Sequence, residues 1–316
     1  MMAAAPESYQ DGFARRWPQL RHPHVRALAW LLDSPDLLDP QDPHWDGKIA
    51  SLGPLNANTT AWLVQLDRDP DALEADLGTK VYTRLGLYAE KLMAFYFRAQ
   101  GVLVAHGLQV RAARNDTVGE FDFLLDTGAG GFEHLEFATK FYLLEGEAAS
   151  PFDTFIGPNL ADSLGAKMRK IIERQLALGT HPAALAMLAQ PVLRARALVK
   201  GWLFYPLDAG QGMAGISAMH CRGFWCALAK LEQLPKQGYV VLPRLQWLAP
   251  YRSDAGAEVL DKDQLHAVLA SRFETAPLPV LVASVREEQG DLLETARGFI
   301  VPNDWRARAA LRQAPA

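Results

Sequence analysis

Two carboxylates and an amine stand at strand spacing between Gly119 and Phe141. Asp122 alternates with phenylalanines in the first half of this segment. Glu136 and Lys140 fall on one face of the second half, because side chains on a β-strand repeat every two residues. Carboxylates are poor strand formers, so their place inside aromatic-rich strands needs a chemical reason. Hard divalent cations such as Mg²⁺ and Mn²⁺ favour oxygen ligands, and the pattern therefore indicates a metal site.

A glycine-rich segment from Asp126 to Gly131 separates the two halves. Glycine adopts positive φ at little cost, as tight hairpin turns require. We therefore expect a β-hairpin in which Asp122 and Glu136 lie next to each other on neighbouring strands. Glu120 points to the same face as Asp122, and it is either a further acidic ligand or a solvated residue at the start of the strand.

Asp122, Glu136 and the nearby lysine resemble the motif of the PD-(D/E)XK phosphodiesterase superfamily, whose fold is also called restriction-endonuclease-like. The resemblance implies a core made of a helix, a three-stranded antiparallel meander, a second helix and a further strand. In the usual motif the lysine follows the acidic residue by two positions, where this chain has Ala138. Lys140 lies one strand repeat further on and is the candidate lysine, and Phe121 stands where the motif usually has proline.

Further segments resemble a bacterial family of the same superfamily to which no substrate is assigned. These segments are Leu85 to Glu90, the hairpin, Gly157 to Asn159 and Lys167 to Leu178. The resemblance as a whole covers most of the chain. In the superfamily a glutamate of the first helix often joins the metal site. The resemblance therefore implies that Glu90 is a third ligand beside Asp122 and Glu136.

The surroundings of Glu90 agree with that role. The spacing of apolar residues predicts a helix over residues 81–100, and Glu90 lies within a second apolar stripe that contains Leu87 and Ala94. A helix that is apolar on two sides is deeply embedded. A carboxylate there costs free energy unless it is paired or bound to a cation. The alternative is a salt bridge, for instance to Arg84.

A second helix is predicted from about Ala161 to Leu178. Its buried stripe includes Gln175, whose amide must find a hydrogen-bond partner and which, in a nuclease site, positions the substrate or a carboxylate. Lys167, Lys170 and Arg174 lie on an adjoining face. They either contact phosphates or form an ordinary solvated basic face.

These residues together predict metal-assisted hydrolysis of phosphodiester bonds in DNA or RNA. Asp122 and Glu136, with Glu90, would hold one or two Mg²⁺ or Mn²⁺ ions, which polarise the phosphate and activate a water molecule. By analogy with the superfamily, the backbone carbonyl of Phe137 is a further ligand. Lys140 would orient the water or stabilise charge that develops on the phosphate.

Two alternatives remain open. Ala138 at the usual lysine position favours a binding or structural module that has kept the nuclease fold without turnover. The acidic net charge favours hydrolysis of a nucleotide or another small phosphate ester. Nothing in the sequence resembles a phosphate-binding P-loop or a dinucleotide fingerprint.

The distribution of charge limits the contact with nucleic acid. The net charge of the 316 residues is −4 at pH 7. Residues 1–79 carry 6 Lys and Arg against 12 Asp and Glu, residues 80–200 carry 14 against 12, and residues 201–316 carry 12 against 12. Proteins that grip long duplexes non-specifically are usually basic. Any footprint on DNA or RNA is therefore small and local, or the ligand is not a long nucleic acid.

The sequence predicts a mixed α/β (α+β) protein in three parts. Residues 1–79 form an N-terminal helical subdomain that opens with a frayed leader over residues 1–20. Residues 80–206 form the restriction-endonuclease-like core, in which 108–113 supply the first strand of the meander and 195–205 supply the fourth core strand. Residues 207–316 form a C-terminal α+β subdomain with strands near 239–242, 280–285 and 297–301 and a helix near 262–273.

The sequence gives no sign of a membrane or an export signal. No segment approaches the ~18 to 20 apolar residues that span a bilayer, and the first residues have neither the basic segment nor the apolar core of a signal peptide. Cys221 and Cys226 make no disulfide scaffold, and with His220 they lack the spacing of a zinc site. We expect a cytoplasmic protein that has these three residues in its core.

Arginine recurs beside aromatic residues in the C-terminal third. Arg222, Arg244 and Arg297 each stand within three residues of a Trp or Phe. Such pairs either stack on nucleic-acid bases or, more commonly, make cation–π and packing contacts within the protein.

Overall fold

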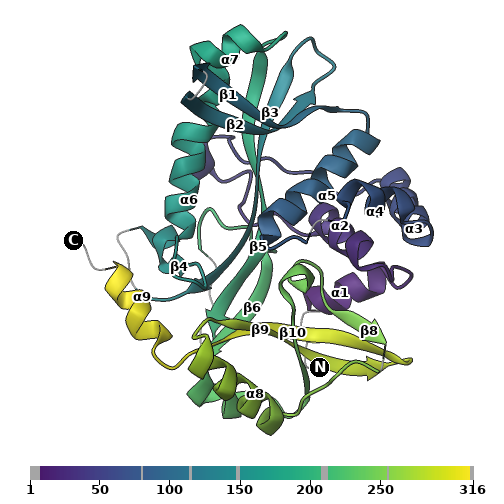
Figure 1. Cartoon of the computed structure of the whole chain (residues 1–316), viewed down its shortest axis with the longest axis vertical. Coiled ribbons are helices and arrows are strands. Elements are labelled where there is room, and N and C mark those ends of the chain that lie inside the picture. Colours follow the sequence, from purple (N-terminus) through teal and green to yellow (C-terminus); the bar gives the residue numbers. More distant parts are fainter. Residues whose placement is uncertain are drawn as a thin grey trace, which may run out of the picture.

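The chain folds around a large mixed sheet that has helices on both faces (Figure 1). The computed structural model describes residues 8–79, 81–113, 116–146, 150–207, 213–254 and 256–313. The helices are α1 (Tyr9–Arg16), α2 (Pro23–Asp33), α3 (Ala57–Arg68), α4 (Asp71–Leu77), α5 (Leu85–Ala99), α6 (Leu164–Lys170), α7 (Pro182–Met187), α8 (Lys262–Thr275) and α9 (Trp305–Gln313). The strands are β1 (Leu103–Ala113), β2 (Asp116–Asp126), β3 (Phe132–Leu144), β4 (Phe155–Ile156), β5 (Val192–Pro206), β6 (Cys221–Ala227), β7 (Gly238–Val241), β8 (Arg252–Asp254), β9 (Val280–Glu288) and β10 (Asp291–Val301).

The ten-stranded sheet has the order β1-β2-β3-β5-β6-β10-β9-β7, with β4 paired to β3 and β8 paired to β10. The four central strands β3, β5, β6 and β10 run parallel to one another. The flanking pairs β1–β2, β2–β3, β9–β10 and β7–β9 are antiparallel. Parallel strands are covered on both faces and therefore carry continuous apolar runs, which agrees with the unbroken burial of β5 from residue 197 to residue 205.

Alternate residues of β3 point into two separate hydrophobic cores. Leu135 and Phe137 belong to the core that contains α2 and α5. Ala138 and Tyr142 belong to the core that contains α6. Helices α5 and α6 therefore lie on opposite faces of the sheet, as Figure 1 also shows. Side chains from both helices can reach β3, but they approach it from opposite sides.

The predicted hairpin is present. Strand β2 ends at Asp126 and β3 begins at Phe132, and Gly128 and Gly130 in the turn between them have φ of 68° and 77°. Strand β1 begins at Leu103, earlier than the predicted start at residue 108.

The strands and the helix predicted in the C-terminal third are also confirmed, as β7, β9, β10 and α8. They do not form a separate sheet, because β6 pairs with β5 and β10 pairs with β6. The division of the chain at residues 79 and 206 stays a prediction, and the sheet itself runs through the second boundary.

The expectation of a frayed leader over residues 1–20 is wrong for the described part of that segment. Residues 9–16 form helix α1, whose N-cap Ser8 accepts a hydrogen bond from the Asp11 backbone N–H. Phe13, Trp17 and Leu20 are buried in the main core. Three apolar anchors at helical spacing thus fix a segment whose other residues are mostly polar or charged.

The helix predicted over residues 161–178 is present, but it is not a regular α-helix along its whole length. Helix α6 ends at Lys170, residues 171–175 form a wider π-turn, and residues 176–180 form a 3₁₀ segment. The predicted apolar stripe is buried nonetheless, through Leu164, Met168, Ile171 and Leu178. A π-turn shifts the angular position of every later side chain, and such turns are frequent at functional sites.

Helix α5 confirms the predicted helix, but it begins at Leu85 rather than at residue 81. The predicted second apolar stripe is wrong at its first member. Leu87 is 46% exposed, whereas Ala94 and Phe97 are buried. Glu90 therefore lies near the edge of the buried surface of α5 rather than deep inside it.

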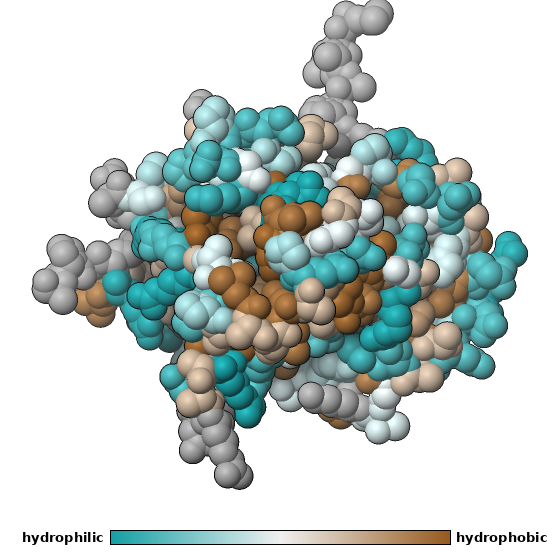
Figure 2. Space-filling model, turned by 90° about the horizontal axis from the view of Figure 1, so that it is seen from above, coloured by the Kyte–Doolittle hydropathy of each residue, from teal (hydrophilic) through white to brown (hydrophobic). Residues whose placement is uncertain are grey.

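Apolar atoms gather on the end of the molecule that Figure 2 views from above. Helix α7 lies at this end in Figure 1, and its Leu185 and Met187 are exposed. Leu193, near the start of β5, is also exposed. No helix within the described ranges is both long enough and apolar enough to cross a membrane.

Candidate active site

The regular pairing of β2 with β3 stops beside the two predicted carboxylates. The ladder runs from Asp126 opposite Phe132 to Phe123 opposite Leu135. At the next position the backbone N–H of Phe137 donates to Asp122 Oδ2, at 2.9 Å, instead of to a strand carbonyl. The ladder does not extend to Asp122 and Glu136, but their side chains lie close enough for each to affect the pKa of the other. The hairpin thus holds both carboxylates together at the point where the ladder ends.

Burial makes it costly for both carboxylates to be charged. Glu136 is 1% exposed. Desolvation by burial raises the pKa of Asp122 to about 8, and the neighbouring charge of Glu136 adds to this shift. Desolvation likewise raises the pKa of Glu136 to about 7, although the charge of Lys167 opposes the shift. Two adjacent carboxyls with raised pKa values either retain a proton or require a cation between them.

The side-chain amide of Gln175 has a hydrogen-bond partner, as the sequence predicted. Its side-chain amide donates to Glu136 Oε1, and its carbonyl oxygen accepts from Lys167 Nζ at 3.2 Å. The π-turn at residues 171–175 ends at Gln175, so the irregular helix and this contact occur at the same place. A chain of hydrogen bonds therefore links an amine on α6 to a carboxylate on β3.

The second oxygen of Glu136 has no such partner. Glu136 Oε2 is buried and makes no hydrogen bond with the described residues. His134 Nε2 lies 3.5 Å from Glu136 Oε2. His134 is fully buried, its two ring nitrogens are likewise without hydrogen bonds among the described residues, and desolvation lowers its pKa to about 4. A neutral imidazole and an unsatisfied carboxylate oxygen thus lie side by side.

Glu90 approaches from the opposite helix and is held by a histidine. His106 Nε2 on β1 lies 2.8 Å from Glu90 Oε1, and the His106 ring stacks on Phe123 with the ring centres 5.3 Å apart. The alternative that Glu90 pairs with a side chain of the protein is therefore correct, but the partner is His106 rather than Arg84. The charge of Glu90 still contributes to the raised pKa of both Asp122 and Glu136.

Glu90 is thus near the carboxylate pair, but its side chain is turned to β1. Among the residues that the structure describes, no three His, Cys, Asp or Glu side chains are grouped closely enough to form a ready metal site. The structure places Asp122 and Glu136 side by side, and the inclusion of Glu90 in a metal site stays a prediction.

The candidate lysine Lys140 has another partner. Its Nζ lies 3.3 Å from Asp162 Oδ2, and the same oxygen accepts a hydrogen bond from the Tyr142 hydroxyl at 3.0 Å. Lys140 is 24% exposed. Its charge is close enough to Lys167 to help lower the pKa of that amine. Lys140 therefore lies near the site but is engaged with the segment that precedes α6.

Lys167 is the amine that contacts the carboxylate network. Lys167, Lys170 and Arg174 were predicted to share one basic face, and Lys170 and Arg174 are indeed exposed. Lys167 is half-buried and reaches Gln175 instead. Burial is the main cause that lowers its pKa, and the charges of Glu136 and Asp122 oppose the change. Glu120, by contrast, is exposed, as expected for a solvated strand residue.

The oxygen ligands that this site offers suit a hard cation. Asp122 and Glu136 supply neighbouring carboxylate oxygens, and Glu136 Oε2 is a buried acceptor that lacks a donor among the described residues. Oxygen-only sites of this kind favour Mg²⁺ and Mn²⁺ over softer metals. Asp122 and Glu136 are therefore the residues that could hold such an ion.

The sulfur and imidazole groups of the C-terminal third belong to the core, as predicted. Cys221 and Cys226 are free and buried. His220 is 4% exposed, and its Nε2 lies 2.8 Å from the Tyr205 hydroxyl.

Each of the three arginines makes a cation–π contact within the protein, but for Arg222 and Arg297 the ring is not a sequence neighbour. Arg297 is fully buried, with its guanidinium carbon 4.1 Å from the centre of the Trp202 ring. The guanidinium carbon of Arg222 lies 3.9 Å from the centre of the Tyr205 ring, and that of Arg244 lies 5.2 Å from the Trp247 ring centre.

Comparison with known proteins gives a family but no activity. No curated protein matches the chain, and no solved structure matches it. Residues 26–301 match the family described as a domain of unknown function, DUF1853. This match spans both carboxylates, the π-turn and all the strands of the sheet. The chain therefore belongs to the DUF1853 family.

Proposed function

We propose that this protein is a metal-dependent phosphodiesterase of the PD-(D/E)XK type that cleaves DNA or RNA over a short footprint. The observation that carries the proposal is the pair Asp122 and Glu136, one bound to the Phe137 N–H and the other keeping a buried oxygen without a hydrogen bond among the described residues. The order of α5, the meander β1–β3, the α6 segment and β5 agrees with the core that the superfamily resemblance implies.

The residues around Asp122 and Glu136 have distinct roles. A bound Mg²⁺ or Mn²⁺ would polarise the phosphate and lower the pKa of a water ligand. Asp122 and Glu136 hold the ion, and Gln175 fixes the orientation of Glu136 through its amide hydrogen bond. Glu90, held by His106, adds negative charge that raises the pKa of both carboxyls and would also attract a cation to the pair.

Two amines compete for the role predicted for Lys140. Lys167 is joined to Glu136 through Gln175, whereas Lys140 is engaged by Asp162. We propose that Lys167 supplies the positive charge beside the phosphate and that Lys140 contacts the substrate backbone further out. An amine from α6 in this position compensates for Ala138, where the usual motif has its lysine.

A test of the proposal is cleavage by the purified protein in Mg²⁺ or Mn²⁺. Single-stranded DNA, duplex DNA, branched DNA and RNA serve as substrates, with a dinucleotide and p-nitrophenyl phosphate as small esters. The proposal expects cleavage of at least one nucleic acid, and it expects Asp122→Asn and Glu136→Gln to abolish that cleavage. Cleavage that survives both substitutions contradicts the assignment of the site.

A second candidate function is a binding module that has the fold without turnover. The observation that favours it is the absence, among the described residues, of a third close metal-binding side chain. Such a module would bind a nucleic acid equally well with and without Mn²⁺ and would cleave none of the substrates. Selective hydrolysis of the small esters would instead indicate a phosphate-ester hydrolase.

A further inference from the structure

A pocket lies at the edge where the central parallel strands end, far from the carboxylate hairpin. It has a volume of about 240 Å³, and its walls come from the ends of β5, β6 and β10 and the segments that follow them. In open sheets, ligands bind in the crevice outside the carboxyl ends of parallel strands. From Glu136 to Leu144 at the end of β3, the strand rises by about 26 Å at about 3.3 Å per residue. The pocket is therefore a separate site.

One wall of the pocket is flat and apolar. Trp225 is fixed in orientation, because its indole N–H donates to the Leu144 carbonyl at 2.9 Å and its ring packs against Trp305 with the ring centres 5.2 Å apart. Pro206 and Leu207 at the end of β5 continue this wall. Trp225 is only 3% exposed, so Pro206 and Leu207 supply most of the apolar surface that a planar ring would contact.

The volume also suits a ring. A cavity of about 150 Å³ accepts benzene, and pockets for larger organic ligands have about 300 to 1,000 Å³. At about 240 Å³, this pocket accommodates one heterocyclic ring, while any attached group would extend toward its mouth.

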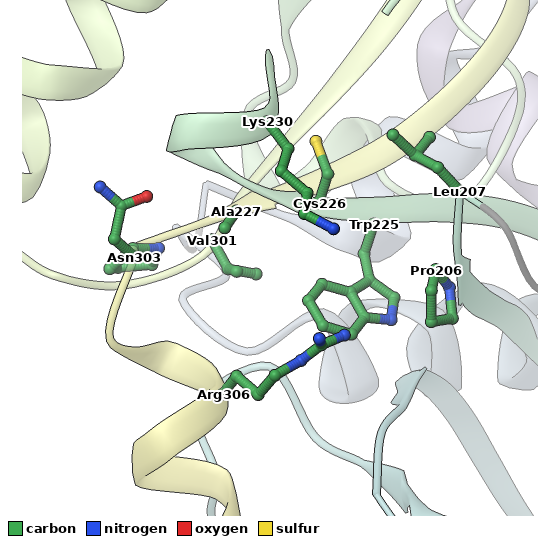
Figure 3. A pocket seen from close by; sticks show the side chains of 10 residues that line it. Pro206, Leu207, Trp225, Cys226, Ala227, Lys230, Val301, Asn303 and Arg306 are labelled. Atoms are coloured by element: carbon green, nitrogen blue, oxygen red, sulfur yellow. The ribbon is translucent and has the colours of Figure 1, made fainter. Parts of the chain in front are cut away.

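Two positively charged side chains lie beside that wall. Figure 3 shows the side chains of Lys230 and Arg306 reaching toward Trp225 from different elements. The guanidinium carbon of Arg306 lies 5.1 Å from the centre of the Trp225 ring. Arg306 pairs with Glu145 at 2.8 Å and is 57% exposed. Lys230 is exposed and makes no ion pair with the described residues, and the negative charge of Glu232 also reaches Cys226 in the pocket lining.

The start of α9 adds to the positive charge of Lys230 and Arg306. Asn303 lines the pocket just before the helix begins at Trp305, and its side-chain oxygen accepts a hydrogen bond from the Ala229 backbone N–H at 2.8 Å. The N-terminal end of a helix carries a partial positive charge that favours anions. The carboxylate of Asp304, which directly precedes the helix and lies 3.4 Å from Arg308, offsets part of this charge. Lys230 and Arg306 therefore supply the main attraction for a bound phosphate.

We propose that this pocket binds a 5′-mononucleotide, with its base against Pro206 and Leu207 beside Trp225 and its phosphate between Lys230 and Arg306. A ring and an anionic group on one small molecule match the two halves of the pocket. Guanidinium and ammonium groups are the usual partners of phosphate in proteins. This site is independent of the proposed phosphodiesterase activity, because it shares no residue with the carboxylate hairpin.

Isothermal titration of the full-length protein in EDTA tests the proposal. The ligands are AMP, GMP, CMP and UMP, with adenosine and inorganic phosphate as partial ligands. Saturable binding of at least one mononucleotide is expected, with Kd at least tenfold weaker for adenosine and for phosphate. Failure of all four mononucleotides to bind at millimolar concentration overturns the proposal, and so does binding of adenosine or phosphate that equals that of the best mononucleotide.

Substitutions locate the binding in this pocket. Lys230→Gln and Arg306→Gln should each weaken the mononucleotide at least tenfold, and Arg306→Lys should recover part of the loss. Lys236→Gln, at another exposed lysine outside the pocket, is the matched control and should change Kd less than twofold. Because Lys230 is exposed and makes no ion pair with the described residues, its substitution leaves folding intact. Binding that is unchanged in Lys230→Gln and Arg306→Gln places the ligand elsewhere and overturns the proposal.

Discussion

The side-chain amide of Gln175 donates to Glu136, and this contact joins a π-turn on one face of the sheet to a buried carboxylate on β3. The same glutamine accepts from Lys167. One residue therefore orients a proposed metal ligand and links it to a proposed catalytic amine. The irregular helix is the structural feature that brings Gln175 to this position.

Substitution of Gln175 should weaken metal binding without removing it. Gln175→Ala removes the donor to Glu136, and loss of such a supporting hydrogen bond typically lowers metal affinity about 10- to 100-fold. Mn²⁺ titration calorimetry measures the change. Gln175→Glu places a further negative charge beside Glu136 and should shift the pH at which Mn²⁺ binds upward. An unchanged affinity in Gln175→Ala would show that the contact has no part in the site.

Lys167 and Lys140 should differ in their effect on turnover. Lys167→Met should lower kcat about 10²- to 10³-fold, as for the loss of one group that stabilises transition-state charge, while KM for the substrate changes little. Lys140→Met should raise KM and lower kcat less than about tenfold, because Lys140 is held by Asp162. Single-turnover cleavage rates separate the two effects. The reverse ranking would restore Lys140 to the role that the sequence motif predicts.

The metal-free protein should lose stability as pH rises. Burial raises the pKa of Asp122 to about 8 and that of Glu136 to about 7, above the unfolded values of about 3.9 and 4.3. A group whose pKa is raised by folding stabilises the native state below its unfolded pKa, and that contribution is lost as pH rises through the folded value. Between pH 5 and 8 the loss is at most about 1.4 kcal/mol per pH unit for each proton.

Urea unfolding in EDTA at a series of pH values measures this loss. Asp122→Asn should flatten the dependence, and saturating Mn²⁺ should reverse it, because the cation replaces the proton at the pair. Equal stability of the wild-type protein at pH 5 and pH 8 in EDTA would contradict the assigned burial of the carboxylates.

The buried pair Arg297 and Glu294 should be a large contributor to stability. Arg297 Nε and Nη2 each lie 2.7 Å from a Glu294 oxygen, and neither side chain is exposed. Arg297→Met leaves Glu294 charged and buried, which typically costs about 3 to 5 kcal/mol. Arg286→Met, at a partly exposed pair with Asp11, is the matched control and should cost less than about 1 kcal/mol. Equal losses in urea unfolding would contradict the role given to burial.

Local patterns in the sequence account for the part of the site that lies on the hairpin. The alternation of Asp122 and Glu136 with aromatic residues, and the glycines of the turn, determine which side chains share a face and where the chain reverses. The long apolar run before Pro206 likewise predicts the central strand β5, because a strand that is buried on both faces needs no polar residues.

Contacts between distant elements are not contained in these patterns. The partner of Glu90 is His106, and this contact depends on how α5 crosses β1 rather than on any short spacing. The inward turn of Lys167 depends on the partner that Gln175 supplies, and Gln175 in turn depends on a π-turn that a regular 3.6-residue period does not predict. His134 could have been found, because it stands two residues before Glu136 and therefore shares its face.

The order of strands in the sheet is also a tertiary property. Strand β10 follows β9 in the sequence but lies between β6 and β9 in the sheet, so the C-terminal strands extend the central sheet instead of forming their own. Apolar alternation identifies each of these strands but does not say which neighbour each one pairs with.

The central claim is that Asp122 and Glu136 together bind a divalent metal ion, and Mn²⁺ titration calorimetry at pH 8 tests it most directly. The wild-type protein should show saturable binding. So should Glu120→Gln, which alters an exposed carboxylate on the same strand as Asp122. Asp122→Asn and Glu136→Gln should show none. Saturable binding of equal affinity in all four proteins, or no binding in the wild-type protein, would contradict the account.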